Sequence, residues 1–423
     1  MDSNNNLRVI VVSAIGGVLE YYDFVVFILF ANIISQVFFP AHESEYLALA
    51  ATYTFFAVGY FVRPIGGIIL AHFGDRYGRK KIFLLTVFLM AIPTFLIGLI
   101  PTYASIGLIA PILLLLMRIC QGLAMGGEIP GSSVFVYEHM TRNLKCSGIS
   151  YLIAGLFGGI LLGSIIGSII TKSLSNESLM VWGWRIPFLL GGLLGVVGMY
   201  LRSKLTETPI FMDIQKHNKQ PKMPIGEILK NHKWSVIAGI CTTLALASTV
   251  TTYYMYLPTY LSKVFKYELS TVFVYNSAAL VFLILATILT GIFSDRSKIN
   301  NKVIYLIGAL IVALFSIAAF DIMKGHNPLL MTLMFLIISI GVGLVSSVFV
   351  LLLIKTFPPN IRFSGVSAAY NISFAVFGGL TPLINTMLIE HSQNPMAPAY
   401  FLIAVNIIGV IALLKIKFLK EEV

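Results

Sequence analysis

The sequence predicts an all-α membrane protein with twelve transmembrane helices, arranged as two parallel six-helix repeats. Three observations lead to this prediction. Only 11% of the 423 residues are charged and 57% are hydrophobic, with a mean hydropathy of +0.89, whereas a soluble chain carries roughly a quarter charged residues. Apolar segments long enough to cross a bilayer recur along the whole chain. The two halves of the chain also carry matching sequence landmarks.

Twelve apolar segments account for most of the chain. Each is near or above the roughly 20 residues that a helix needs to cross the hydrocarbon core. The first is too long for a signal-peptide core and has no small-residue cleavage pattern, so we expect a retained first span. The segments lie at residues 9–37, 47–71, 81–100, 106–137, 148–171, 183–201, 234–261, 270–293, 303–321, 328–354, 364–389 and 398–414.

The basic residues are distributed unevenly between the two sides of the membrane. If the N-terminus is cytoplasmic, 22 of the 29 Lys and Arg lie in or beside cytoplasmic segments, five lie on the other side and two lie inside spans. This positive-inside bias predicts that both termini are cytoplasmic. The net charge of +11 therefore reflects topology and not a nucleic-acid partner. We expect a multi-pass protein of a bacterial cytoplasmic (inner) membrane, surrounded by lipid and monomeric.

The longest polar connection divides the spans six and six. It covers residues 202–233 and is rich in Pro, Lys and Asn, which is typical of a cytoplasmic linker. We therefore expect an N-terminal six-helix bundle at residues 1–201 and a C-terminal six-helix bundle at residues 234–423.

Three landmarks recur between the halves. The pair Asp75-Arg76 recurs as Asp295-Arg296, 220 residues later. NLKCSGIS recurs as NIRFSGVS after 217 residues, and a Phe-Gly-Gly triplet recurs after 220. An even number of spans in each half makes the two repeats parallel, and parallel six-span halves are typical of a transporter rather than a channel.

Several stretches carry a resemblance to a known family. GDRYGRKK resembles the loop signature of the major facilitator superfamily. LEYYDF, VRPIGG, RICQGLAMGGEIPGS and WGWRIPFLLG narrow the resemblance to its metabolite–proton symporter branch, and TETPIF and FPPNIRFSGVSAAYNISFAVFGG agree with it. The resemblance covers the whole chain and is nearest to the proline/betaine transporter type. It implies proton-driven uptake of proline, glycine betaine, α-ketoglutarate, citrate or shikimate.

Five charged residues lie within the apolar spans, and all belong to the first half: Glu20, Asp23, Arg63, Arg118 and Glu128. A charge at the bilayer centre costs about 2.5–3.5 kcal/mol on insertion scales, so each should face the bundle interior and have a partner. Glu20 and Asp23 share one face of a helix. An ion pair between Arg63 and Glu20 is possible, because their depths agree within about 6 Å.

The candidate proton-coupling residues are Asp23, Glu20 and Glu128. The chain has no GK dipeptide and hence no phosphate-binding P-loop, which argues against ATP-driven pumping. All seven histidines lie in loops or at span ends. A buried carboxylate that gains and loses an arginine partner can bind and release a proton. We favour Asp23 or Glu20 as the proton site; the alternative is a static ion-pair lattice that fixes the first, second and fourth spans together.

Arg63 and Arg118 are the candidate ligands of a substrate carboxylate. Gln121 lies on the same helical stripe as Arg118 and Glu128. Tyr22 and Tyr254 belong to a set of aromatic residues that could attract a quaternary ammonium group. The substrate-binding set is therefore Arg63, Arg118, Gln121, Tyr22 and Tyr254.

The sequence thus predicts proton symport of a small zwitterion such as proline or glycine betaine by alternating access. The formal charge of the five buried residues is −1, which one proton neutralises. A dicarboxylate or tricarboxylate such as α-ketoglutarate or citrate is the alternative substrate, since arginines can also clamp anions. A channel or a facilitator without proton coupling is the alternative from another class.

The loop GDRYGRKK is a candidate gate. Its glycines allow a tight turn, its aspartate can accept from an arginine or from a helix N-terminus, and the family resemblance implies a latch that stabilises the outward-open state. With the corresponding pair of the second half, the candidate gating residues are Gly74, Asp75, Arg76, Gly78, Arg79, Asp295 and Arg296.

The sequence has no pattern of an enzyme or of a metal site. No His or Cys cluster and no nucleophile–base pair is evident. The three cysteines, Cys120, Cys146 and Cys241, are far apart and form no CxxC motif. We expect no enzymatic activity, no metal and no cofactor.

Overall fold

The computed structural model describes the backbone of residues 3–40, 44–77, 79–203, 232–297, 299–357 and 362–415. Within these ranges, side chains are described except at residues 3–13, Glu20, 71–84, 138–139, 142 and 201–203. All regular elements of the described residues are helical. Most of the linker predicted at 202–233 lies outside this part, so the division into bundles at 1–201 and 234–423 stays a prediction.

Helices of the first half follow one another with short connections. They are α1 (Ser3–Leu29), α2 (Ala31–Phe38), α3 (Glu45–Phe61), α4 (Arg63–Tyr77), α5 (Arg79–Leu99), α6 (Tyr103–Ile106), α7 (Ile109–Met125), α8 (Glu128–His139), η1 (Arg142–Leu144), α9 (Lys145–Ser173), α10 (Asn176–Val181), η2 (Gly183–Arg185) and α11 (Ile186–Ser203).

Helices of the second half begin after the linker. They are α14 (Lys233–Val250), η3 (Thr251–Tyr256), α15 (Leu257–Val264), α16 (Leu269–Arg296), α17 (Asn301–Ile322), η4 (Met323–Gly325), α18 (Pro328–Ile354), α19 (Arg362–Ser373), η5 (Phe374–Gly378), α20 (Thr381–Ser392) and α21 (Ala397–Lys415).

The helices account for the twelve predicted spans. Ten segments of the described residues are long and apolar enough to cross a membrane. The bent pair α1–α2, which turns by 62°, corresponds to the first predicted span, and the shorter apolar helix Leu85–Leu99 corresponds to the third. The chain is a multi-pass integral membrane protein, as predicted.

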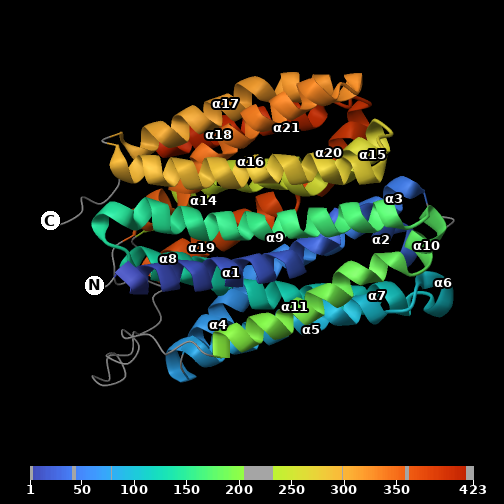
Figure 1. The fold of residues 1–423 in the computed structure, drawn as a ribbon, viewed down its shortest axis with the longest axis horizontal. Helices are drawn as coiled ribbons and strands as arrows, with labels where there is room; N and C mark the ends of the chain where they lie inside the picture. Colours follow the sequence, from blue (N-terminus) through green and yellow to red (C-terminus); the bar gives the residue numbers. More distant parts are fainter. Residues whose placement is uncertain are drawn as a thin grey trace.

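The long helices run side by side, and both termini lie at one end of the bundle (Figure 1). We call this the termini end; α6, α10 and α15 lie at the opposite end. The first half meets the second along two seams. In one seam α9 packs against α16, and in the other α3, α4 and α8 pack against α19 and η5.

Several spans are interrupted near their middle. The second span breaks at Val62 between α3 and α4, and the fourth breaks at Gly126 and Gly127 between α7 and α8. In the seventh and eleventh spans, η3 and η5 are π-helical turns. Wider turns of this kind are rare and frequently lie at functional sites. The breaks in the first half place Arg63 and Glu128 at the starts of helices.

Glycines let α7 approach the second span very closely. A Cβ atom added at Gly122 would lie 2.1 Å from the carbonyl oxygen of Gly59, and one at Gly126 would lie 2.0 Å from that of Arg63. At Gly127 the nearest such neighbour is Leu70, at 3.8 Å. Small residues at a helix interface allow this backbone contact within a membrane.

Replacing Gly122 should therefore destabilise the fold much more than replacing Gly127. We expect Gly122→Ala to cost about 1–3 kcal/mol because α7 must move away from α3, and Gly127→Ala to be nearly neutral. Thermal unfolding of the two purified variants in the same detergent measures the difference. Equal melting temperatures would contradict this packing.

Candidate functional site

Arg63 lies in the interior at the junction of the two halves. It is the first residue of α4, directly after the break at Val62, and its side chain is 0% exposed. Among the described residues, none of its three guanidinium nitrogens has a partner at hydrogen-bond geometry. An arginine keeps its charge in proteins, and burying a charge without partners is costly. The side chain of Glu20, its predicted partner, lies outside the described residues, so the expectation that Arg63 has a partner stays a prediction.

Three aromatic rings surround the Arg63 guanidinium. Its central carbon lies 5.0 Å from the ring centroid of Tyr60, 5.7 Å from that of Tyr370 and 5.6 Å from that of Phe374. Tyr60 belongs to α3 in the first half, whereas Tyr370 and Phe374 belong to α19 and η5 in the second. Ring faces attract a cation but supply no hydrogen-bond acceptor. The guanidinium therefore remains able to bind an anionic group.

Arg118 is a second fully buried arginine, and it lies within the first half on α7. Its Nη1 atom donates to Oε1 of Gln121 at 2.7 Å and to the carbonyl oxygen of Phe24 at 3.2 Å. Its Nε and Nη2 atoms have no partner. The guanidinium carbon lies 4.4 Å and 4.5 Å from the ring centroids of Phe24 and Phe27. The structure thus brings Arg118 and Gln121 together.

Asp23 is a buried carboxyl group that forms no ion pair with either arginine. Its side chain is 3% exposed, and Oδ1 has no hydrogen-bond partner. The carboxyl group faces α11, where a Cβ atom added at Gly191 would lie 2.6 Å from Oδ1. Glycine at this position leaves the room that the carboxyl group occupies.

The other two candidate carboxylates lie elsewhere. Glu128 begins α8, and its Oε2 atom accepts from Thr86 Oγ1 on α5 at 3.3 Å. The side chain of Glu20 lies outside the described residues, and so the pairing of Glu20 with Arg63 stays a prediction.

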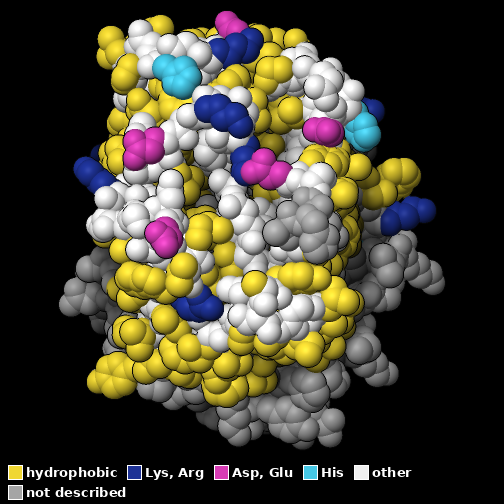
Figure 2. Space-filling model, turned by 90° about the vertical axis from the view of Figure 1, so that its right-hand side faces the viewer, with side chains coloured by type: hydrophobic (Ala, Val, Ile, Leu, Met, Phe, Trp, Pro, Cys, Tyr) yellow, Lys and Arg dark blue, Asp and Glu magenta, His cyan; other side chains and the backbone are white. Residues whose placement is uncertain are grey.

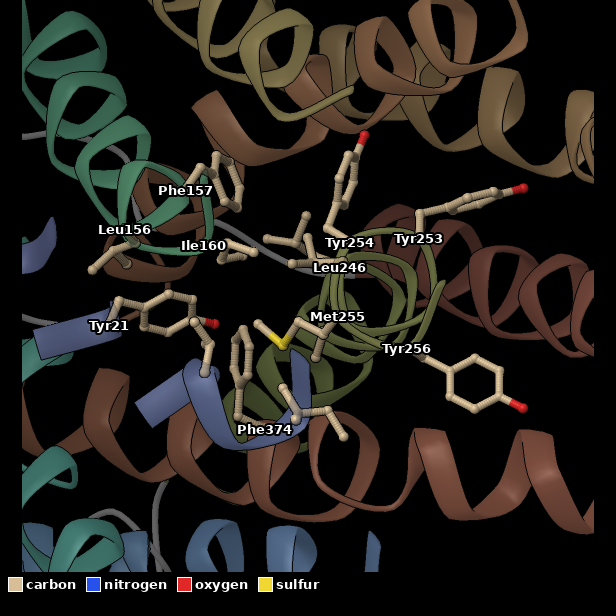
Figure 3. Close-up of a cluster of buried hydrophobic side chains, with 14 of the residues drawn as sticks. Tyr21, Leu156, Phe157, Ile160, Leu246, Tyr253, Tyr254, Met255, Tyr256 and Phe374 are labelled. Carbon is tan, nitrogen blue, oxygen red and sulfur yellow. The ribbon is translucent and has the colours of Figure 1, made fainter. Parts of the chain in front are cut away.

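The two candidate tyrosines direct their hydroxyl groups into their own halves. Tyr22 donates to the carbonyl oxygen of Pro187 at 2.7 Å, and the Tyr254 hydroxyl lies 2.9 Å from Ser339 Oγ. Figure 3 shows Tyr254 pointing away from Phe374, while the neighbouring Met255 points toward it. Neither tyrosine is among the described rings around Arg63.

At the termini end, Asp295 connects the two halves. Its carboxylate accepts from the backbone N–H groups of Cys146 at 3.1 Å and Ser147 at 2.7 Å, and from the Ser147 hydroxyl. These are the first residues of α9 in the other half, so Asp295 caps that helix. Arg296 is exposed. Gly78 lies outside the described residues, as do the side chains of Asp75, Arg76 and Arg79, and only the backbone of Gly74 is described.

The opposite end also holds the halves together. Lys263 of α15 forms an ion pair with Glu45, the first residue of α3. Figure 2 shows this end, where basic and acidic side chains both occur. The halves are therefore in contact at both ends, with Arg63 buried between them.

Comparison with known proteins identifies the family. Residues 14–382 match the sequence profile of the Major Facilitator Superfamily. The chain belongs to the major facilitator superfamily.

Relatives within this superfamily are named as transporters, in agreement with the expectation that the chain is not an enzyme. A putative proline/betaine transporter of Staphylococcus aureus (strain COL) is 34% identical over 412 residues, which cover 97% of this chain and 88% of that one. The proline/betaine transporter of Escherichia coli (strain K12) is 33% identical, with 97% and 83% covered. A glycine betaine/proline/ectoine/pipecolic acid transporter, OusA of Dickeya dadantii (strain 3937), is 33% identical, with 100% and 84% covered.

Solved structures show the same fold. The proton:xylose symporter XylE bound to 6-bromo-6-deoxy-D-glucose superimposes with a TM-score of 0.78 at 17% identity, covering 98% of this chain and 95% of that chain. A partially occluded inward-open form of XylE from E. coli gives a TM-score of 0.76 at 18% identity, with 97% of each chain covered. The predicted twelve-helix major facilitator fold is confirmed.

Several uncharged residues at the two seams of this superfamily member were not predicted from the sequence. Asn276 of α16 donates to Ser164 Oγ of α9 at 2.6 Å, and Asn371 of α19 donates to the carbonyl oxygen of Gly126 at 2.7 Å. Tyr370, next to Asn371, lies over Arg63. Neutral amides do not stand out by charge, but an isolated Asn in an apolar span needs a partner in a membrane, and that signal could have identified them.

The contact of Asp295 with the N-terminus of α9 predicts how readily the two halves separate at the termini end. Asp295→Asn removes the negative charge at the α9 N-terminus, so the halves should separate there more readily. With Cys120 and Cys241 replaced by Ser, maleimide labelling of the buried Cys146 should become about threefold faster or more, which corresponds to about 0.7 kcal/mol. Asp321→Asn, which breaks the exposed pair with Lys324 at the opposite end, is the control. Equal labelling rates would rule out this role.

Proposed function

We propose that the protein is a secondary active transporter that carries a small zwitterion, such as proline or glycine betaine, together with a proton by alternating access. The observation that carries this proposal is the fully buried Arg63 guanidinium, which lies between rings from both halves and has no partner at hydrogen-bond geometry in the described part of the chain. The names of the relatives support the substrate class.

The two groups of a zwitterion match the two features at Arg63. A substrate carboxylate can accept two parallel hydrogen bonds from the free guanidinium. The faces of Tyr60, Tyr370 and Phe374 can attract the ammonium group. Because these rings belong to different halves, a bound substrate would contact both, as alternating access requires.

Asp23 is the proton site in this proposal. A buried carboxyl group that forms no ion pair with Arg63 or Arg118, and whose Oδ1 atom has no donor among the described residues, is costly to keep ionised, so proton uptake relieves that cost. Glu128 already accepts from Thr86, and Glu20 remains a further candidate on α1.

A second candidate substrate is a dicarboxylate or tricarboxylate such as α-ketoglutarate or citrate. Arg118 supports it, because its Nε and Nη2 atoms have no partner. Two guanidinium groups with free donors could clamp two carboxylates. A panel of labelled substrates therefore decides between one carboxylate and two.

The proposed setting is a bacterial inner membrane, with both termini cytoplasmic and the protein acting as a monomer in lipid. The positive-inside charge pattern supports this orientation. The proposed gate at the termini end comprises the Asp295-Arg296 pair and its counterpart in the loop GDRYGRKK.

Uptake by proteoliposomes under an imposed pH gradient tests the substrate and the role of Arg63. We expect accumulation of labelled proline or glycine betaine, abolished by an uncoupler. Arg63→Gln should weaken apparent affinity about 100-fold or more, because a carboxylate would be buried without its partner. Arg185→Gln, at the opposite end, is the control. An unchanged affinity in Arg63→Gln would contradict the role of Arg63 in substrate binding. Accumulation of α-ketoglutarate or citrate in place of proline and glycine betaine would favour the second candidate substrate. Uptake that the uncoupler does not affect would indicate a facilitator without proton coupling.

Asp23→Asn tests the proton site separately from substrate binding. Asn is nearly isosteric and cannot take up a proton, so the variant should lose accumulation driven by the pH gradient and retain counterflow of labelled against unlabelled substrate. Asp321→Asn should retain both activities. Full gradient-driven accumulation in Asp23→Asn would move the proton site to Glu20 or Glu128.

A further inference from the structure

Gln121 connects three helices of the first half through one side-chain amide. Its Nε2 atom donates to Thr94 Oγ1 on α5 at 2.7 Å and to the carbonyl oxygen of Asp23 on α1 at 3.3 Å. Its Oε1 atom accepts from Arg118, on its own helix. Both N–H donors of the amide are used, and the side chain is 0% exposed. Gln121 therefore has no donor left for a substrate.

The same network fixes α1 at the proton site. Phe24 follows Asp23 directly, and its carbonyl oxygen accepts from Arg118. Two consecutive carbonyl oxygens of α1 thus receive donors from α7, in addition to the backbone bonds that a helix supplies. These contacts fix the rotation of α1 about its axis and its position along that axis at Asp23.

Thr94 links Gln121 to the surroundings of the Asp23 carboxyl group. Its hydroxyl donates to the carbonyl oxygen of Met90 at 2.8 Å and accepts from Gln121, which fixes its rotamer. Its methyl carbon then faces α11: a Cβ atom at Gly191 would lie 2.7 Å from it and 2.6 Å from Asp23 Oδ1. The hydroxyl of Thr94 is consequently directed away from the proton site.

Few titratable groups face the Asp23 carboxyl group in the described part of the chain. Tyr22, its neighbour on α1, donates to Pro187, and Arg118 on α7 is held by Phe24 and Gln121. On α5 and α11, Thr94 and Gly191 lie beside the carboxyl group. Glu20 precedes it by one turn on α1.

We propose that Gln121 is a positioning residue for the proton site. It holds Thr94 and Arg118 in positions where they bond to other groups and fixes the α1 backbone there, so that neither donates to the Asp23 carboxyl group. This inference rests on the proposed role of Asp23, and it assigns to Gln121 an action through Asp23 rather than on the substrate.

The pH dependence of uptake tests this role. Gln121→Leu removes the contacts that hold the Thr94 rotamer and the Arg118 guanidinium, so that either group can turn and donate to the carboxylate, which favours its ionised form. The pH of half-maximal gradient-driven uptake should fall by about half a unit or more, while the KM in counterflow at equal pH stays within about twofold of the parent. Gln121→Asn keeps an amide that is too short for all three partners and should shift the midpoint in the same direction.

A double-mutant comparison isolates the part played by Thr94. Thr94→Val removes the hydroxyl whose rotamer Gln121→Leu would release, so the shift caused by Gln121→Leu should be smaller in the Thr94→Val background. Thr52→Val is the matched control, since Thr52 is also fully buried but bonds only to Ala48 within its own helix. It should leave both the midpoint and the KM unchanged.

The outcomes separate this inference from the proposed function. If Asp23→Asn abolishes the pH dependence but Gln121→Leu and Gln121→Asn keep the parent midpoint, Asp23 remains the proton site and the positioning role is wrong. A raised counterflow KM with an unchanged midpoint would make Gln121 a substrate ligand, which also overturns it. If Asp23→Asn keeps the parent pH profile, the proton assignment fails and this inference fails with it. Should Gln121→Leu not give a monodisperse protein, Gln121→Asn decides by the same criteria.

Discussion

A guanidinium group that cannot lose its charge is buried between the two halves, and none of its nitrogens has a partner at hydrogen-bond geometry among the described residues. Burying such an ion costs several kcal/mol even after relaxation, so the surrounding helices must hold Arg63 there by packing. The break at Val62 places it at the start of α4, and the glycine contacts of α7 fix that start in position. An anionic ligand can supply hydrogen-bond acceptors to the guanidinium, so binding of such a ligand would offset this cost.

The two halves contribute different chemistry to this junction. In the described residues the buried charges belong to the first half, whereas the second supplies rings and amides; these charges are Asp23, Arg63, Arg118 and Glu128. Tyr370 and Phe374 lie on the eleventh span, one before and one within the π-helical turn η5. A site built in this way is complete only while the halves are together, so binding and the movement of the halves are linked.

The first half also separates its proposed proton site from its arginines. Asp23 faces the glycines of α11, while Arg118 is engaged with carbonyl oxygens and Gln121. The Asp23 carboxyl group and the Arg118 guanidinium are not paired, so a change in charge or a shift of α1 could bring them together. Coupling between proton and substrate can therefore be short-range, within three helices of one half.

The sequence was sufficient for properties that depend on local spacing and composition. The positions of the spans, the burial of both arginines and the contact of Arg118 with Gln121, three residues apart, follow from helical periodicity. The rings around Arg63 could not be predicted, because they depend on how the eleventh span meets the second. The direction of Tyr254 could not be predicted either, since a π-helical turn departs from 3.6 residues per turn and changes which side chains face inward. Asn276 and Asn371 carry no charge and were missed for that reason.

Equilibrium binding of glycine betaine to the purified protein tests the central claim about Arg63 most directly, because it needs no gradient and no movement of the halves. Isothermal titration calorimetry of the parent and of Arg63→Gln, with choline as the ligand that lacks a carboxylate, separates the two groups of the zwitterion. The account predicts that the parent binds glycine betaine but not choline, and that Arg63→Gln binds neither. Binding of glycine betaine to Arg63→Gln with the affinity of the parent would contradict it.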